Sequence, residues 1–437
     1  MKRREFVKTS ALATGALAIN VPTYAADKKI KLAILGTGWW GTDFLLNHAM
    51  ISGHFDIVAL CDVDSVNLNR AAKAVTDKGL KKPKLFSNYK EMYDLKGLLA
   101  VCIATPTHWH ALQFIAACEK GLDVLLEKPV SYDIRESQAM LAAKQKAGNV
   151  VLVDFPRAMS DTDNQVKAFI ESGEAGKIYQ VKSNIHNPDA MLVEKEIPST
   201  LDFDSYCGPA PVVKFMCNEN RNNPNWRGIH DLSRGVFADW GIHYIHNIRN
   251  NLGLDLPNTI SAIGGNTRNF TQDNPDHLNV RFDFDGLPVL WEHMSWGYIS
   301  PNPERRIGNY YYGDKGTIFE GDIGWEFYPK EGETFVNGPI AFNPGSPENG
   351  KKYDKMFQDL FAEFAQGIRT QSNKEITNTF EGGVKTTSCV TLADMAYRTQ
   401  ATLELDATNM DIKNNEKAQQ LLKREYRTPY KHPYVTS

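Results

Sequence analysis

The sequence has few cysteines, no metal-ligand spacing and no long apolar run after the N-terminal segment. Each absence excludes a class of protein. Six cysteines in 437 residues do not make a disulfide framework, and we expect them to be small buried residues. Neither C-x-x-C nor H-E-x-x-H occurs, so the sequence predicts no metal site. The net charge is only −3 and no basic stripe is present, so no nucleic-acid partner is expected. Beyond the N-terminus, no apolar stretch is long enough to predict a membrane span.

Residues 1–26 have the composition of a targeting segment. Paired arginines, Arg3 and Arg4, precede a mildly apolar stretch rich in Ala and Gly, which ends in small residues at Ala25. The pair, followed by a large apolar residue and then Lys8, resembles a twin-arginine signal. A Sec signal and a basic cytoplasmic tail are the alternatives. The segment therefore predicts an exported, periplasmic protein that crosses the membrane already folded.

The clearest motif follows the apolar run at residues 30–35, which fits a strand buried on both faces. Three glycines come next in the spacing G-x-G-x-x-G. Gly36 permits a tight turn, Gly38 lets the backbone approach a pyrophosphate, and Gly41 lets the next helix pack against the strand. That helix would begin near Trp39 and direct its free N–H groups at the phosphates. The motif therefore predicts a dinucleotide site.

An acidic residue stands where such a unit holds the ribose of its cofactor. Residues 42–52 indicate a helix and residues 55–61 a second apolar strand, which ends at Asp62. A carboxylate there accepts both hydroxyls of an adenine ribose and repels a 2′-phosphate, which favours NAD. Asp64 is a second acid close by, and an ordinary βαβ unit with an acidic turn is the alternative. NADP remains an alternative cofactor, because two further side chains could accommodate its 2′-phosphate: Asn67 and Arg70.

Strands and helices alternate through residues 27–153, which predicts a Rossmann domain with a doubly wound parallel sheet. From residue 154 the strands become longer and alternate in polarity. Such strands place one sheet face on a core and leave the other free or paired with another chain. Residues 154–437 therefore predict an α/β domain with a large, mostly antiparallel open sheet. The helices expected in this domain are residues 161–171, 353–369, 381–405 and 415–424, and residues 197–242 are expected to be ligand-side loops leading into a helix.

Two short segments carry groups suited to proton transfer. Glu127, Lys128 and Pro129 follow a buried strand, where a lysine can hydrogen-bond a substrate hydroxyl, and a cis proline would aim it inward. Asp239 and His243 are at positions i and i+4 of an expected helix, so they share one face, and a histidine beside a carboxylate suits a general base. A surface turn is the alternative for the first segment. A helix cap with a core histidine, or a metal pair with His246, is the alternative for the second.

Together these segments resemble the glucose–fructose oxidoreductase/inositol dehydrogenase/rhizopine-catabolism (Gfo/Idh/MocA) family over nearly the whole chain after the N-terminal segment. The resemblance rests on the order and spacing of residues 36–41, 105–110, 127–129, 201–211, 225–228 and 239–243. It implies a Rossmann domain, an α/β domain whose sheet often mediates oligomers, and oxidation or reduction of a sugar or cyclitol carbon with NAD(P). A dimer or tetramer with a tightly bound cofactor is the expectation.

The resemblance also assigns roles to single residues. Lys128 would be the catalytic lysine, and His243 the histidine that takes or gives the hydroxyl proton, with Asp239 beside it. The expected cofactor-binding residues are Gly36, Gly38, Trp39, Trp40, Gly41, Asp62, Thr105, Pro106, His108, Trp109, His110, Glu127 and Lys128. The expected substrate contacts are Arg157, Trp226, Arg227, His230, Asp231 and His243. Pro156 departs from the family pattern, which leaves the role of Arg157 open, and loop packing is the alternative for the four residues between 226 and 231.

Three hypotheses follow from these features. The first is an exported oxidoreductase that retains its cofactor and acts on a sugar, glycoside or cyclitol. The second is a redox-assisted glycosidase of the same fold, in which C3 is oxidised, the bond is cleaved by elimination and the hydride returns. The third is a non-catalytic NAD sensor, against which the presence of Lys128, Asp239 and His243 argues.

Overall fold

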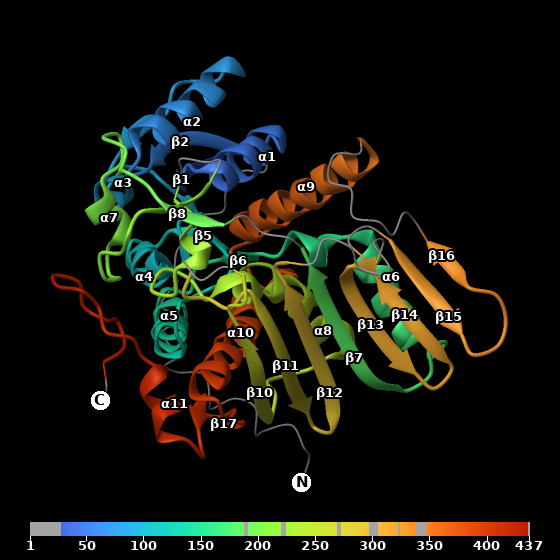
Figure 1. The fold of residues 1–437 in the computed structure, drawn as a ribbon. Helices are drawn as coiled ribbons and strands as arrows, with labels where there is room; N and C mark the ends of the chain where they lie inside the picture. The colour runs from blue at the N-terminus through green and yellow to red at the C-terminus, as the bar shows by residue number, and fades with distance from the viewer. Residues whose placement is uncertain are drawn as a thin grey trace, which may run out of the picture.

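Two sheets organise the part of the chain that the computed structural model describes (Figure 1). That part is residues 28–435 apart from 188–190, 220–223, 269–271, 297–304, 322–323 and 338–346. The predicted targeting segment, residues 1–26, lies outside the described residues. Within them, no helix combines the length and the apolar character that a membrane crossing needs.

The first sheet has six parallel strands in the order β3-β2-β1-β4-β5-β6, so the predicted doubly wound sheet is confirmed. Its strands are β1 (Ile30–Leu35), β2 (Phe55–Cys61), β3 (Lys84–Phe86), β4 (Ala100–Ile103), β5 (Asp123–Glu127) and β6 (Val151–Asp154). The helices between them are η1 (Trp40–Leu46), α1 (Asn47–Ile51), α2 (Ser65–Asp77), α3 (Tyr89–Tyr93), η2 (Thr107–Trp109), α4 (His110–Glu119) and α5 (Ile134–Ala147). The short β3 and α3 were not predicted, because three and five residues carry too little periodicity.

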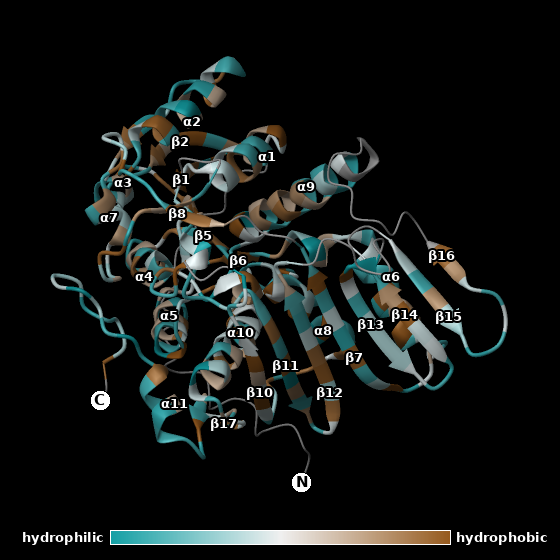
Figure 2. Ribbon diagram, viewed as in Figure 1, coloured by the Kyte–Doolittle hydropathy of each residue, from teal (hydrophilic) through white to brown (hydrophobic). Residues whose placement is uncertain are grey.

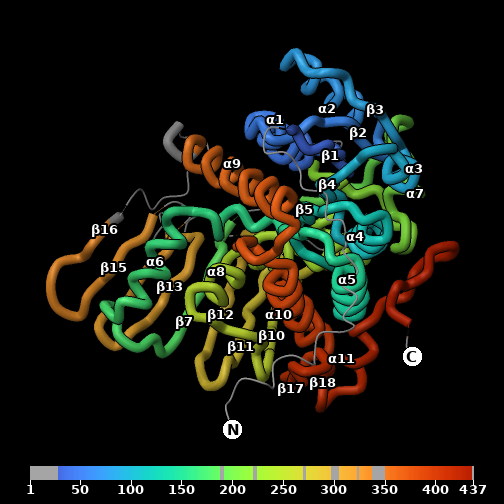
Figure 3. Tube along the Cα trace, turned by 180° about the vertical axis from the view of Figure 1, so that it is seen from behind, coloured from blue at the N-terminus to red at the C-terminus, as the bar shows by residue number. Residues whose placement is uncertain are grey.

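A helix from late in the chain covers one face of this sheet. α9 (Pro347–Thr370) lies beside α1 and across the parallel strands in both views (Figures 1 and 3). Its fully buried Phe361 and Phe364 rings have centroids 5.7 and 6.0 Å from that of Phe55 on β2. The helix was predicted locally, but the sheet that it covers ends at Asp154, almost 200 residues before α9 begins.

The second sheet has ten strands in the order β16-β15-β14-β13-β7-β12-β11-β10-β17-β18. All neighbours are antiparallel except β7 and β12, as expected for a large, mostly antiparallel sheet. Polar and apolar residues alternate along its strands (Figure 2), because one face is buried. The strands are β7 (Ile178–His186), β10 (Thr259–Gly265), β11 (His277–Phe284), β12 (Leu287–Met294), β13 (Ile307–Gly313), β14 (Gly316–Glu320), β15 (Trp325–Pro329), β16 (Phe335–Asn337), β17 (Leu403–Asp406) and β18 (Asp411–Ile412).

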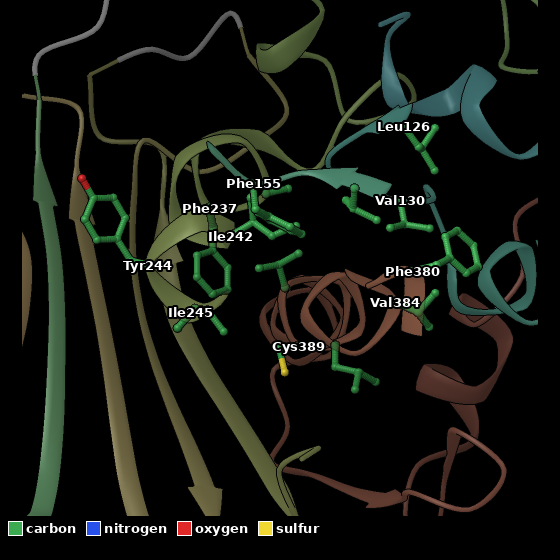
Figure 4. Packing of buried hydrophobic residues seen from close by; sticks show 14 of the residues in the cluster. Leu126, Val130, Phe155, Phe237, Ile242, Tyr244, Ile245, Phe380, Val384 and Cys389 are labelled. Carbon is green, nitrogen blue, oxygen red and sulfur yellow. The ribbon is translucent and has the colours of Figure 1, made fainter. Parts of the chain in front are cut away.

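Three helices cover the buried face: α6 (Asp161–Glu171), α8 (Ile242–Leu252) and α10 (Phe380–Thr399), which stand before the sheet in Figure 3. One apolar cluster joins them to the first domain. In Figure 4, Phe155 and Ile242 lie in the same cluster as Val130 and Phe380. The opposite face of the sheet is covered by no helix of the described ranges (Figure 1). This bare face fits the expected role in oligomers, which stays a prediction.

The predicted helix over residues 381–405 was wrong only at its end, from residue 400 on. α10 ends at Thr399 because Gln400 adopts a left-handed conformation with φ of 52°, and the chain then turns into β17, which pairs with β10. The segment 197–242 is also more ordered than loops alone. It contains α7 (Phe203–Cys207), β9 (Met216–Asn218), which pairs with β8 (Leu192–Glu194), η4 (Trp226–Gly228) and the π-helical turn η5 (Phe237–Gly241). All six cysteines are buried and free, as predicted.

The last segment of the chain returns to the first domain after α11 (Glu416–Leu421), and residues 422–435 form what we call the C-terminal strap. Arg424 Nη2 donates to His108 O at 2.7 Å, and its Nε donates to Glu136 Oε1 at 3.0 Å. Arg427 pairs with Asp204 on α7 at 2.5 Å. The strap thereby ties α7 to the loop after β4.

Candidate active site

The glycine turn has the geometry that its spacing predicts. Gly36 has a φ of +88°, and a Cβ there would lie 2.7 Å from the backbone of Ala104. A Cβ on Gly41 would lie 1.9 Å from Gly36 O, so the helix approaches the turn as closely as glycine allows. At Gly38 a Cβ would meet nothing within 4 Å, which leaves open space above the backbone. The turn is therefore shaped to receive a pyrophosphate at Gly38.

Asp62 is the acid that faces this turn. Its Oδ2 accepts hydrogen bonds from Thr37 N at 2.6 Å and Thr37 Oγ1 at 3.0 Å. Asp64 instead caps α2, because its side chain accepts a hydrogen bond from Val66 N at 2.9 Å. Of the two acids that the sequence left open, Asp62 is the one that hydrogen-bonds to the glycine turn. Arg70 pairs with Asp43 at 2.7 Å beside the turn. Asp62 therefore lies at the end of β2 beside the glycine turn, where an acid that holds the ribose of NAD is expected.

A single cleft of about 1170 Å³ runs from the glycine turn to the start of α8. It has room for a dinucleotide together with a small substrate. The predicted residues that line it are Gly36, Gly38, Trp39, Trp40, Gly41, Asp62, Thr105, Pro106, Trp109, Trp226, Arg227 and Asp239. Residues more than 180 positions apart in sequence thus share one wall, as the resemblance implied.

At the α8 end, a buried carboxylate joins two cations. Lys128 Nζ donates to Asp239 Oδ1 at 2.8 Å and to Asp239 O at 2.7 Å, and Arg227 Nε donates to Asp239 Oδ2 at 2.5 Å. The Lys128–Pro129 peptide is cis, as predicted. Burial alone would raise the pKa of Asp239, but the Arg227 and Lys128 charges outweigh it and hold that pKa well below its usual range. Asp239 therefore positions Lys128 and does not cap the helix.

His243 lies one turn beyond Asp239 and is half-buried. Its Nδ1 is buried without a hydrogen-bond partner among the described residues, and the ring stands edge-on to Phe155 at 5.9 Å. Burial, followed by the charges of Lys128 and Arg157, lowers the pKa of His243 well below 6.5. A neutral imidazole with an unused nitrogen suits a proton acceptor.

His246 does not act with His243. It stacks on Phe155 at 3.8 Å, and its Nδ1 lies 3.0 Å from Thr386 Oγ1, so it is a core residue. The metal-pair alternative therefore has no support in the site.

Glu127 lies behind the cleft wall next to Asp154, its register partner across β5 and β6. Burial and the Asp154 charge raise the pKa of Glu127 well above its usual range. Trp40 Nε1 donates to Asp154 Oδ2 at 3.0 Å, which links this acid pair to the glycine turn. Glu127 Oε1 is buried with no hydrogen-bond partner among the described residues.

Two histidines predicted to bind the cofactor do not line the cleft. His110 is buried between two carbonyls, with Nδ1 2.7 Å from Pro129 O and Nε2 2.7 Å from Thr105 O. His108 is fully buried, and its Nε2 lies 2.9 Å from Tyr206 O. Both side chains are occupied by backbone partners, so they brace the loops that carry the site.

Three predicted substrate contacts also lie outside the cleft lining. Arg157 is buried under the Tyr244 ring at 4.4 Å and donates to Gly321 O, so it acts on His243 through its charge. His230 Nε2 lies 3.4 Å from Asp394 Oδ2, outside the cleft lining. Asp231 does not line the cleft either.

The sequence analysis missed Tyr430 of the C-terminal strap, which lines the cleft and stands edge-on to Trp109 at 5.4 Å. No local pattern marks it, because its neighbours lie over 300 residues earlier. The strap also covers a group with metal-ligand spacing, Asp133, Glu136 and His432. Their oxygens and nitrogen are already engaged with Arg424, Tyr426 and one another, so the group is an ion-pair network.

Together, the sheet order, the glycine turn and Asp62 define a dinucleotide-binding α/β protein. Residues 30–155 match the Gfo/Idh/MocA model of the oxidoreductase family with an NAD-binding Rossmann fold. Residues 186–272 match the C-terminal alpha/beta domain model of the same family. Both matches support a Gfo/Idh/MocA oxidoreductase that binds NAD.

Similar proteins point in the same direction. A glycosyl hydrolase family 109 protein of Stenotrophomonas maltophilia is 33% identical over 155 residues, covering 34% of each chain. An inositol 2-dehydrogenase of Salmonella typhimurium is 27% identical over 192 residues, covering 44% of this chain and 55% of the relative. The chain thus spans about a third to a half of the curated relatives it matches. Levoglucosan dehydrogenase, solved with NADH and levoglucosan, has the same fold with a TM-score of 0.66 at 18% identity, covering 86% of this chain and 99% of the other.

Proposed function

We propose that the protein transfers a hydride between NAD and a hydroxyl-bearing carbon of a sugar, glycoside or cyclitol. The observation that carries this proposal is that Asp239, which holds Lys128, lines one end of a cleft whose other end is the glycine turn, with His243 one helical turn beyond Asp239. The similarity to an inositol 2-dehydrogenase and to the fold of a levoglucosan dehydrogenase supports the substrate class. Gly36–Gly41, Asp62 and Glu127 would hold the cofactor, which supplies the hydride acceptor when bound.

Side chains of this protein bind the substrate hydroxyl and transfer its proton. Lys128, held by Asp239, donates a hydrogen bond to the substrate hydroxyl oxygen and stabilises the negative charge that develops there. His243 is neutral at pH 7 and accepts the hydroxyl proton. In the reverse direction the same ring returns it. Trp226, whose ring packs against Arg227, offers a flat apolar surface to the sugar.

The first test is to purify the protein without added cofactor, denature it and identify any released nucleotide. Released NAD(H) would support a tightly bound cofactor, and NADH formation with a panel of sugars and cyclitols would then identify the activity. A protein that carries no dinucleotide and binds none when it is added would overturn the proposal.

A redox-assisted glycosidase is the second candidate, and the similarity to a glycosyl hydrolase family 109 protein favours it. Such an enzyme would release an aglycone from a glycoside with no net formation of NADH. The two candidates are separated by measuring aglycone and NADH in the same reaction.

We further propose that residues 1–26 direct export to the periplasm by the twin-arginine route. Replacing Arg3 and Arg4 with Lys and following the protein in periplasmic fractions tests this proposal.

A further inference from the structure

Arg227 presents two unused nitrogens to the substrate end of the cleft. It lies on η4, its Nε donates to Asp239 Oδ2 at 2.5 Å, and its side chain is 42% exposed. Its Nη1 and Nη2 donate to none of the residues whose positions the structure gives. These two nitrogens form the planar fork with which arginine binds both oxygens of a carboxylate.

Other ion-paired arginines of this protein use their forks on the protein itself. Arg305, just before β13, donates Nε and Nη2 to the two carboxylate oxygens of Glu326 on β15 at 2.7 and 2.8 Å. Arg424 engages Glu136 and a backbone carbonyl. Arg227 differs because only Nε, one of its three guanidinium nitrogens, donates to another described residue. Arg227 itself lines the cleft.

The charges on the cleft wall around Arg227 are two cations and one carboxylate, and the Glu127–Asp154 acid pair lies behind that wall. Two cations, Lys128 and Arg227, share the single carboxylate of Asp239. The other acids that line the cleft, Asp62, Asp64 and Asp202, stand at the far end near the close of β2. The remaining polar side chains lining the α8 end are neutral: Asn187, Asn218, Asn225, Gln272, Asn274 and Ser295. The unused fork of Arg227 would attract an anionic ligand to this end of the cleft.

Arg227 is also held in place before any ligand binds. Its backbone N–H donates to Asn225 Oδ1 at 3.2 Å, and its carbonyl accepts from Asn274 Nδ2 at 2.9 Å. The guanidinium stacks over the Trp226 ring at 4.6 Å. A fork fixed in this way loses little entropy when it binds a planar anion.

We propose that the substrate is an acidic sugar or cyclitol, whose carboxylate is bound by Nη1 and Nη2 of Arg227. This inference rests on the proposed function, because it takes Lys128 and His243 to act on a hydroxyl of the same molecule. Lys128 and Arg227 are bridged by one carboxylate, so their spacing suits two substituents of a single ring. Arg227 is thus a residue that determines specificity.

The test compares acids with their neutral partners. D-glucuronate is paired with D-glucose, D-galacturonate with D-galactose, and glucose 6-phosphate serves as the phosphate probe. Binding to the NADH-loaded protein is measured by calorimetry, and kcat/KM is measured with NAD. The variants are Arg227→Gln and Arg227→Lys, and the matched control is Arg305→Gln, which removes a guanidinium remote from the cleft.

The wild-type protein should prefer the acid of a pair by about 10- to 100-fold, the strength of a charge-assisted hydrogen bond. Arg227→Gln should reduce that ratio to within about threefold, Arg227→Lys should restore part of it, and Arg305→Gln should keep it. Arg227 also contacts Asp239, so its substitution will lower the absolute rates with both the acid and the neutral sugar. The ratio of the two kcat/KM values is therefore the quantity to compare.

Four results would overturn the inference. One is a protein that oxidises neutral sugars with NAD but binds no acid better, which leaves the proposed function intact. A second is an acid preference that survives Arg227→Gln. A third is a wild-type protein that prefers glucose 6-phosphate to the carboxylate sugars. The fourth is a loss of NADH affinity in Arg227→Gln equal to the loss of acid affinity, which would assign the fork to the phosphates of the cofactor. A wild-type protein that binds no NADH would remove both the inference and the proposed function.

Discussion

Replacing Asp239 with Asn tests whether the bridge between Lys128 and Arg227 is a buried ion pair that organises the site. The Asp239 and Lys128 side chains are 7% and 10% exposed, and their nearest polar atoms are 2.8 Å apart. Breaking a buried pair costs about 3–5 kcal/mol, because an uncompensated charge remains. The Arg227 pair adds little, since that side chain is 42% exposed.

The expected shift in melting temperature follows from the length of the chain. An unfolding entropy of about 2.1 cal/mol/K per residue over 437 residues corresponds to roughly 1 °C per kcal/mol, so Asp239→Asn should melt about 3–5 °C below wild type. The rate of NADH formation should fall about 10²- to 10⁴-fold, because Lys128 loses its anchor. Differential scanning calorimetry checks the first value and steady-state kinetics the second. Asp77→Asn, which removes an exposed pair with Lys73, is the control and should stay within about 1 °C. Equal melting of Asp239→Asn and wild type would refute the buried bridge.

The other predictions concern the proton acceptor and the glycine turn. Lys128→Ala and His243→Ala should each lower turnover about 10²- to 10⁴-fold, while NADH fluorescence titrations still show binding; lost binding would mean that the roles are divided differently. Because burial and nearby cations lower the pKa of His243, its base form is complete at neutral pH, so kcat/KM for oxidation should stay flat through pH 6.5 and fall only in more acidic buffers. A fall centred at pH 6.5 or above contradicts this. Gly38→Ala should fold normally but bind NAD at least about tenfold more weakly, whereas Gly41→Ala, whose Cβ would lie 1.9 Å from Gly36 O, should also melt earlier; unchanged titrations for both would contradict the turn's role.

The parts of the site that could be predicted are those with local causes. The positive φ of Gly36 and the close approach at Gly41 follow from the fact that only glycine lacks a Cβ, so spacing alone reveals them. The buried strands follow from short apolar runs, whereas Asp239, predicted to orient His243 one turn away, accepts from Lys128 and Arg227 instead. The glycine turn and the buried strands need no knowledge of distant segments.

Three residues that were predicted to bind ligands are held by partners that the local sequence pattern does not reveal. His110, Arg157 and His230 have side chains suited to ligands, but a carbonyl pair, the Tyr244 ring and Asp394 respectively occupy them in the fold. Each partner lies between about 5 and 160 residues away, and no periodicity reports such contacts. Tyr430 was missed for the same reason, because its place in the cleft depends on the path of the whole strap.

The late position of α9 and the C-terminal strap has a consequence for synthesis of the protein. The six strands of the first sheet are complete by Asp154, but α9 begins at Pro347 and the strap ends near residue 435. A ribosome adding 5–20 residues per second needs roughly 15–60 s to cover that interval. For roughly the first 10–40 s, until α9 is complete at Thr370, the face that contains Ile34 and Phe55 is covered by η1, α1 and α2 but lacks α9. The growing chain must therefore be protected from aggregation, and the dinucleotide can be enclosed only after translation has nearly finished.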